Sequence, residues 1–439
     1  ADTGAYSSEG IPVLDQATLF ATGPYEIPNI LIKGLSVYTN NIPCGAMRGF
    51  GIPQSAFAIE CLIDELAEQM KLTPFEIRRI NGLRIGSTTA TGQILRASVP
   101  FIQTVDVAES TIEKALRELP SPVPGRTRGI GIASSYKNVG IGLGMPEPTG
   151  VMIELLPSGK IFIRFGGAEL GQGSDTTIAQ IAADTLHVPY KMIEVYACDT
   201  GRKPDGGVTS ASRTTFMSGN AVVEAAPIFL NLLHEVQGNT ENLNEISLIR
   251  LAKRMHKDGR TLSISHTYQP PQTFPLSAQD ETSNINFVTF SYATQVAIVD
   301  VDPASGEVEV KKMIAVHDVG RAINPMGAKG QIEGSCVMGM GYALSEELIL
   351  DKGYLATDTL AKVGIPTINH APSLDVILIE DPEPSGPFGA KGIAEAAAIP
   401  SAPAILNAIH DALHVRIYRL PATPDRVAGA VLNQEYCPK

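Results

Sequence analysis

The fold is decided by residues 166–177, which read GGAELGQGSDTT. Two apolar runs typical of strands, 151–155 and 161–165, come before this stretch, and a helix is expected over 175–186. Glycines in such a turn let the backbone approach a ligand, and amides at a helix N-terminus attract anions. The pattern also fits an ordinary strand-to-helix turn whose serine or aspartate caps the helix.

Further elements follow from apolar periodicity and end signals. A capping box at Thr73-Pro74-Phe75-Glu76 starts one helix, which ends near Gly82. Other helices are expected near 57–70, 105–119, 219–236 and 401–413, and strands at 292–301 and 308–316. Residues 1–50 are expected to form short strands and turns, and 256–285 a long surface connection. Helices and strands do not alternate strictly, which favours an α+β fold.

Composition excludes several classes of protein. The chain has 439 residues with 34 basic and 46 acidic side chains, a net charge of −12. It therefore lacks the basic surface that nucleic acid or an anionic membrane requires. The five cysteines are scattered, which indicates reduced thiols in a cytoplasmic protein and no iron–sulfur cluster on this chain. The polar start lacks a signal peptide and a Met, so a processed or partial polypeptide is expected.

Three further segments carry polar side chains in patterns that suit chemistry. Residues 209–215 (TSASRTT) combine small hydroxyls with an arginine, as in a phosphate nest, or simply cap a helix. Glu395 is a lone carboxylate in an apolar run before a helix, which suits a general base, although a solvent-facing glutamate at a helix start fits as well. Arg48 and Phe50 lie in a glycine-flanked loop, where Phe50 could instead be a core residue. Gln331 either contacts a ligand or belongs to the start of a helix.

In this order, segments 45–54, 169–176, 209–215, 330–334 and 386–395 resemble the molybdenum hydroxylase (xanthine dehydrogenase/aldehyde oxidoreductase) family. The resemblance extends over nearly the whole chain and is weakest in 240–285. It implies the C-terminal portion of the molybdopterin-binding subunit, with another chain carrying the N-terminal half, as in a split or processed subunit. The expected units are 1–119, the end of a first molybdenum-binding domain; 120–285, a cofactor-binding subdomain that begins with a linker at 120–129; and 286–439, which carries the glutamate loop.

The resemblance also implies roles for individual residues. Glu395 matches the catalytic base, with Gly392 and Ile393 on the loop beside a metal that the pterin dithiolene, and no protein side chain, would hold. Residues matched to cofactor contacts are Arg48, Leu170, Gly171, Gln172, Gly173, Ala211, Ser212, Thr214 and Gln331. Phe50 matches one of two phenylalanines that clamp an aromatic substrate, and the second has no counterpart within 139–142. Gln16 replaces a substrate-binding arginine of purine-hydroxylating members.

The reaction implied is insertion of water-derived oxygen at an electron-poor carbon of a purine-like or nicotinate-like N-heteroaromatic. Molybdopterin, in its cytosine dinucleotide form, would carry the molybdenum, and electrons would pass to 2Fe-2S and FAD groups on partner chains. Three alternatives stay open: aldehyde oxidation, reductive dehydroxylation as in the 4-hydroxybenzoyl-CoA reductase branch, and a non-catalytic subunit that only holds the cofactor.

Overall fold

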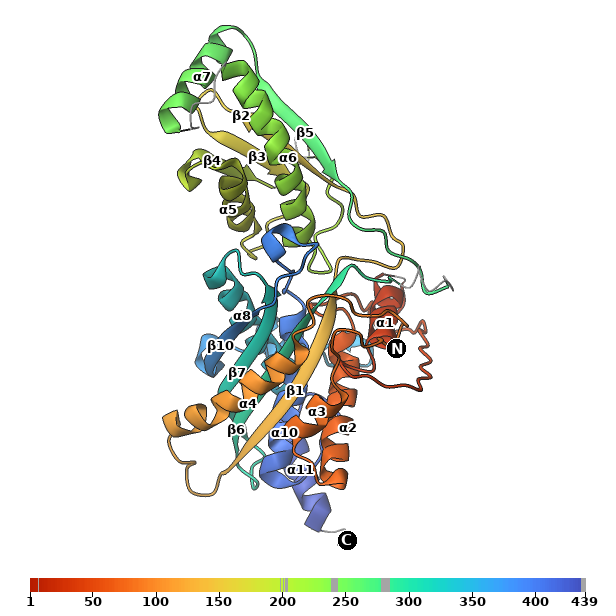
Figure 1. Cartoon of the computed structure of the whole chain (residues 1–439). Coiled ribbons are helices and arrows are strands. Elements are labelled where there is room, and N and C mark those ends of the chain that lie inside the picture. The colour runs from red at the N-terminus through yellow and green to blue at the C-terminus, as the bar shows by residue number, and fades with distance from the viewer. Residues whose placement is uncertain are drawn as a thin grey trace.

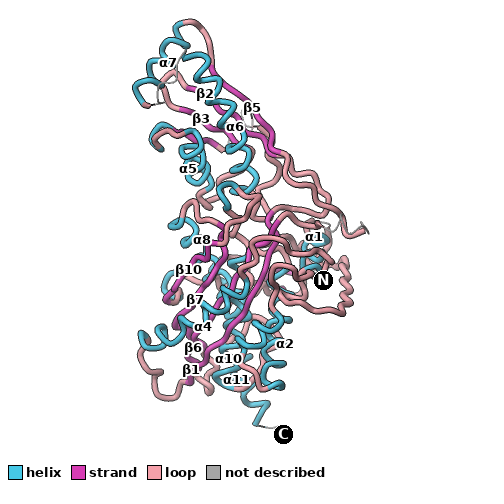
Figure 2. Tube along the Cα trace, in the orientation of Figure 1, coloured by secondary structure: helices cyan, strands magenta, loops and turns pink. Residues whose placement is uncertain are grey.

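A computed structural model describes the chain except residues 7, 198, 200, 202–203, 238–243, 278–284 and 436–439. The described chain forms two lobes, each built on a four-stranded sheet with helices packed against it (Figure 1). Figure 2 shows helices and strands mixed in both lobes, which confirms the α+β prediction. Of the five cysteines, Cys198 and Cys437 lie outside the described residues.

The larger lobe contains the sheet β1–β6–β7–β10, in which only the β7–β10 pair is parallel. Its strands are β1 (Thr127–Val139), β6 (Thr289–Val301), β7 (Val308–Gly320) and β10 (Ser373–Glu380). Its helices are α1 (Gly10–Leu19), α2 (Ile52–Met70), α3 (Pro74–Asn81), α4 (Phe101–Glu118), α8 (Pro325–Leu344), α10 (Ser401–Leu413) and α11 (Pro424–Glu435). A small excursion holds β8 (Leu350–Asp351), β9 (Tyr354–Leu355) and α9 (Leu360–Val363).

Strand β6 is buried along its whole length because helices cover both faces of the sheet. Alternate residues point to opposite faces, so Val296 and Ile298 pack with α4 while Ala297 and Val299 pack with α8 and α10. Glycines at 129 and 131 of β1 allow α10 to lie directly against the strand, since a Cβ there would collide with the α10 backbone. The core therefore fixes β1 and the segments that follow it.

The smaller lobe contains the sheet β4–β3–β2–β5, formed by β2 (Thr149–Leu155), β3 (Ile161–Phe165), β4 (Ile193–Tyr196) and β5 (Leu262–Tyr268). Its helices are α5 (Ser174–Leu186), α6 (Thr214–Gln237) and α7 (Glu245–Lys257). By length and composition α6 is the one described helix that could cross a membrane, but 61% of its most apolar window is buried within the protein. Its apolar side chains form the core with β2, β3 and α5.

Most elements predicted from periodicity are present, and the capping box of α3 is confirmed. The Thr73 hydroxyl accepts from the Glu76 amide at 3.1 Å, and the Glu76 carboxylate accepts from the Thr73 amide at 2.7 Å. The prediction of strands and turns throughout 1–50 was wrong at α1, which packs against α2 despite a glycine and a proline at its start. Tertiary packing outweighs the weak local signal there.

Two other expectations differ from the structure. The surface connection expected at 256–285 contains strand β5, which pairs with β2 over seven residues and closes one edge of its sheet. Strand β1 begins at Thr127, inside the expected linker, and pairs with β6 over thirteen residues. The strand therefore belongs to the sheet of the larger lobe, although the sequence division had placed it with the residues of the smaller one.

Candidate active site

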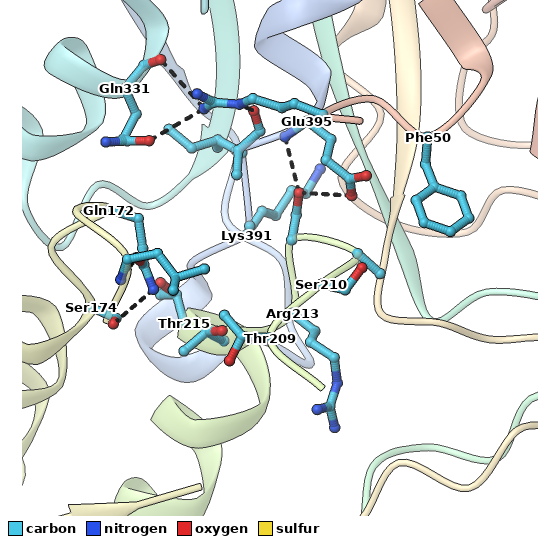
Figure 3. A pocket seen from close by; sticks show the side chains of 18 of the residues that line it. Phe50, Gln172, Ser174, Thr209, Ser210, Arg213, Thr215, Gln331, Lys391 and Glu395 are labelled. Atoms are coloured by element: carbon cyan, nitrogen blue, oxygen red, sulfur yellow. Dashed lines mark hydrogen bonds between the residues drawn. The ribbon is translucent and has the colours of Figure 1, made fainter. Parts of the chain in front are cut away.

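A cavity of about 670 Å³ lies where loops of both lobes meet. Four segments line it, at 46–50, 170–177, 209–215 and 391–395, together with Gln331 of α8. Thus the motifs that are far apart in the sequence share one wall (Figure 3). Of the residues predicted for the site, all except Gly173 and Gln16 line this cavity.

In the glycine-rich loop before α5, the backbone amides bind a carboxylate from the same loop. The Glu169 carboxylate accepts from the amides of Gly171 at 2.8 Å, Gly173 at 3.0 Å and Asp175 at 3.1 Å. Burial opposes ionisation, yet these hydrogen bonds leave the pKa of Glu169 below its usual range. Three amides that the sequence analysis offered to an anion are therefore taken by a side chain of the same loop.

Gln172 stiffens the same loop and contributes to the cavity wall. Its amide nitrogen donates to the Ala168 carbonyl at 2.6 Å and to the Ser174 hydroxyl at 3.1 Å, and its oxygen accepts from the Leu170 amide at 2.5 Å. Gln331 of α8 donates to the Gly171 carbonyl at 3.5 Å. The loop is thus held from both lobes, with its backbone facing the cavity.

In the second predicted anion-binding segment, 209–215, the arginine side chain points into the protein interior. The Arg213 guanidinium donates to Glu147 at 2.9 Å and to the Thr149 hydroxyl at 3.0 Å, and it is buried. Figure 3 shows its side chain extending away from Glu395. A phosphate site built on Arg213 is therefore a wrong prediction. The segment instead presents small side chains, including Ala211, Ser212 and Thr214.

The loop carrying Glu395 is fixed by close packing and a buried ion pair. Gly392 lies against the Ser212 carbonyl, where a Cβ would collide with the oxygen. The Lys391 ammonium donates to Asp318 at 2.7 Å and to the Ser98 carbonyl at 2.9 Å, and both charged side chains are fully buried. Burial raises the pKa of Asp318 to about 6, against the attraction of Lys391.

Glu395 is buried, with 7% of its surface exposed, which excludes the solvent-facing alternative. Its backbone amide donates to the Ser212 hydroxyl at 3.1 Å, and that hydroxyl donates to carboxylate oxygen Oε2 at 3.3 Å. The Lys137 ammonium lies 3.6 Å from the same oxygen. In the described part of the chain, Oε1 carries no hydrogen bond, so its lone pairs are left for a group in the cavity.

Arg48 joins three parts of the site. Its Nε donates to the Ala394 carbonyl, and its Nη2 lies 3.4 Å from the Gln331 carbonyl and 3.3 Å from the Gln331 amide oxygen. Burial lowers the pKa of Arg48, while attraction to Glu395 opposes that shift. The guanidinium therefore ties α8 to the glutamate loop and adds positive charge near the carboxylate.

Phe50 stands beside the Glu395 carboxylate in Figure 3 and is the one aromatic side chain in the described cavity wall. Residues 139–142 supply no second ring, as expected from the sequence.

Gln16 lies elsewhere: it is buried in α1, and its amide oxygen accepts from Lys137 at 3.2 Å. The expected substrate contact of Gln16 is therefore replaced by a contact with a lysine. The sequence reasoning missed Lys137, whose one signal is a lysine within a long strand.

His317, a buried residue of β7 behind the site, makes the stability of the folded chain depend on pH. Burial first, and then the charge of Arg48, lower the pKa of His317 to about 3. The unfolded chain takes up this proton below about pH 6.5 while the folded chain does not, so stability is full above that pH and falls as the pH drops. Between pH 7 and pH 5 the parent should lose about 2 kcal/mol of its free energy of unfolding through this histidine, and His317→Gln should not show that loss.

Urea unfolding at the two pH values measures this difference, and His256→Gln, at an exposed helix position, is the control. An equal loss in the His317 variant and the parent would contradict the assignment of a neutral buried imidazole.

Family models and curated relatives match most of this chain. A family model described as "Molybdopterin cofactor-binding domain" matches residues 105–372, and a second with the same description matches 1–82. The chain is 32% identical to a probable xanthine dehydrogenase subunit of Bacillus subtilis, covering 98% of this chain and 59% of that protein. It is 30% identical to the nicotine 6-hydroxylase large subunit of Paenarthrobacter nicotinovorans, covering 98% and 56%.

The solved structure of the aldehyde oxidoreductase from Desulfovibrio desulfuricans superposes with a TM-score of 0.85 at 29% identity. The match covers 98% of this chain and 46% of that one. The chain thus spans about half the length of the relatives it matches, and its described fold superposes on that part of the solved structure.

Proposed function

This chain belongs to the molybdenum hydroxylase family, which includes xanthine dehydrogenases and aldehyde oxidoreductases, and we propose that it supplies the base-bearing part of a hydroxylase active site. The oxygen inserted would come from water. The observation that carries this proposal is Glu395, a buried carboxylate with Oε1 free toward a cavity bounded by two glycine-bearing loops.

The cavity fits a molybdopterin in size and lining. Its volume falls within the range of about 300–1,000 Å³ that is usual for ligand sites. A Cβ at Gly171, which lines the cavity, would meet no protein atom within 4 Å, so the loop backbone there faces open space that a flat heterocycle can fill. Gln331 supplies an amide group for the edge of a pterin, Gln172 supports the loop backbone that faces it, and Ser212 lies against Gly392.

The dinucleotide form is also part of the proposal. A smaller cavity of about 90 Å³ shares Gln172, Gln331 and Lys391 with the main one and reaches Arg321, just before α8. Because three amides of the glycine-rich loop donate to Glu169 and the Arg213 guanidinium donates to Glu147, this extension is the better place for the phosphates. An exposed arginine and a helix N-terminus favour negative charge there.

When bound, the molybdenum cofactor would accept two electrons and activate water. The chain's own residues then have three tasks. Glu395 takes a proton at Oε1 as the new carbon–oxygen bond forms, which is the work of a general base. Ser212 and Lys137 hold Oε2, and Arg48 adds positive charge on the side of Ala394. Phe50, which lies on the same side of the cavity as the Glu395 carboxylate in Figure 3, would stack against the ring of the substrate and turn its reactive edge toward Glu395.

We propose an N-heteroaromatic substrate of purine or nicotinate type. The single aromatic wall at Phe50 suits a flat ring, and relatives are named for xanthine and nicotine. Aldehyde oxidation is the second candidate, favoured by the absence of a second ring to clamp the substrate in the described cavity wall. We also propose a cytoplasmic complex in which a chain carrying the N-terminal half and subunits with 2Fe-2S and FAD complete the enzyme. Relatives named as subunits support the presence of partner chains.

A substrate screen on the complete complex tests the proposed reaction. We expect reduction of an artificial electron acceptor with a purine or nicotinate, and ¹⁸O in the product when turnover takes place in H₂¹⁸O. Benzaldehyde is the comparison substrate for the second candidate. Turnover that places oxygen from O₂ in the product would contradict the proposal, and turnover of the aldehyde alone would favour the second candidate.

A further inference from the structure

We propose that Lys137 is a positioning residue for Glu395: its buried ammonium attracts the carboxylate and holds Oε2, so that Oε1 stays directed to the cavity. The inference rests on the proposed function and extends it to a residue outside the cavity wall. Lys137 is 2% exposed and lies 3.6 Å from Glu395 Oε2. It does not line the cavity, so it acts through Glu395 and not on the substrate.

The partners of Lys137 leave its charge directed at one anion. Besides Glu395, its ammonium donates to the Gln16 amide oxygen at 3.2 Å and to the Asn138 amide oxygen, and it lies 5.8 Å from the Phe20 ring centroid. Amide oxygens orient an ammonium without neutralising it. Among the described residues, Glu395 is the one carboxylate that ion-pairs with Lys137.

The charges that face Glu395 come from two other elements. Arg48, from the loop before α2, attracts it, and Lys137 does so from β1. Lys391, on the glutamate loop itself, is committed to Asp318, and Ser212 supplies only a hydroxyl. His317, behind Arg48, is neutral, because its pKa is lowered to about 3. Lys137 is therefore the cation in direct contact with the base.

A purely structural role is a poor explanation of this lysine. Burial lowers the pKa of Lys137, which shows that the site disfavours the ammonium, while Glu395 opposes the shift. A buried ion pair is often no better for stability than apolar residues of the same size. A leucine or methionine at this position of β1 would avoid the free-energy cost of burying a charge. The ammonium is therefore explained by its contact with the Glu395 carboxylate.

Infrared pH titration of the complete complex tests this role without requiring turnover. The difference between the parent and Glu395→Gln identifies the carboxylate band of Glu395. In Lys137→Met we expect that band to give way to the protonated form about one to three pH units higher than in the parent. The acidic limb of the kcat/KM profile should move by the same amount, and Lys137→Arg should restore both to within about half a unit. An unmoved band and limb in Lys137→Met would overturn the proposal.

Lys312→Met is the matched control, because it removes another buried lysine, which pairs with Glu118 and Asp375, and none of the three lines the cavity. If Lys137→Met does not fold, Lys137→Gln takes its place: it removes the charge but keeps a hydrogen-bonding group, and the same upward shift of the Glu395 band is expected. An unmoved band in that variant would overturn the proposal. A parent complex without turnover would refute the hydroxylase function but leave the infrared test intact. An active parent with an unmoved band refutes Lys137 alone.

Discussion

Glu395→Gln is expected to reduce kcat by about 10²–10⁴-fold while molybdenum and pterin content stay at the parent level. The amide has the shape of the carboxylate and can still accept from the Ser212 hydroxyl, but it cannot take a proton at the position of Oε1. The cofactor wall consists mainly of other segments, so binding should be little affected. Steady-state turnover with an artificial acceptor, beside metal analysis of the same sample, measures both quantities.

Glu333→Gln is the control for this variant, since Glu333 is an exposed carboxylate on α8 outside the cavity wall. We expect it to keep the activity of the parent. Survival of the Glu395 variant within about tenfold of the parent would show that another group is the base, because a lost general base costs more than that.

Lys391→Met should lower the free energy of unfolding by about 3–5 kcal/mol at pH 8, because it leaves Asp318 buried without its cation. The sign of the pH dependence follows from Asp318, whose pKa burial already raises to about 6. A raised pKa favours the folded state at low pH, and this contribution is lost as the pH rises through 6. The variant should therefore lose less stability at pH 5, where Asp318 takes up a proton.

Urea unfolding of the parent and the variant at pH 5 and pH 8 tests this prediction. Lys362→Met provides the comparison: it removes an exposed ion pair with Asp358, and we expect a change below about 1 kcal/mol. If Lys391→Met cost as little as that control at pH 8, the buried pair would not be what secures the glutamate loop.

Much of the site could be predicted because its residues lie in short, ordered motifs. The glycine-rich turn, the 209–215 segment and the glutamate loop each precede a helix, and sequence identifies such junctions well. Glu395 stood out as a lone carboxylate in an apolar run, and the structure places it on the cavity wall. The resemblance to a family then predicted that these separate motifs belong to one site.

The rest depended on side-chain directions that only tertiary packing determines. Glu169 folds back onto the amides of its own loop, and Arg213 turns inward to Glu147, and neither direction could be predicted from the sequence. Lys137 and Gln16 are distant in sequence and meet only because α1 packs near β1. Strand β1 was missed for a similar reason: its pairing with β6 is a long-range interaction that local periodicity does not reveal.

The most direct test of the whole account is the molybdenum content of the purified complex that contains this chain. A chain whose loops hold a molybdopterin between its two lobes should carry about one molybdenum atom per copy, released together with the pterin when the complex is denatured. Absence of molybdenum from a folded, fully assembled complex grown with molybdate would contradict the account.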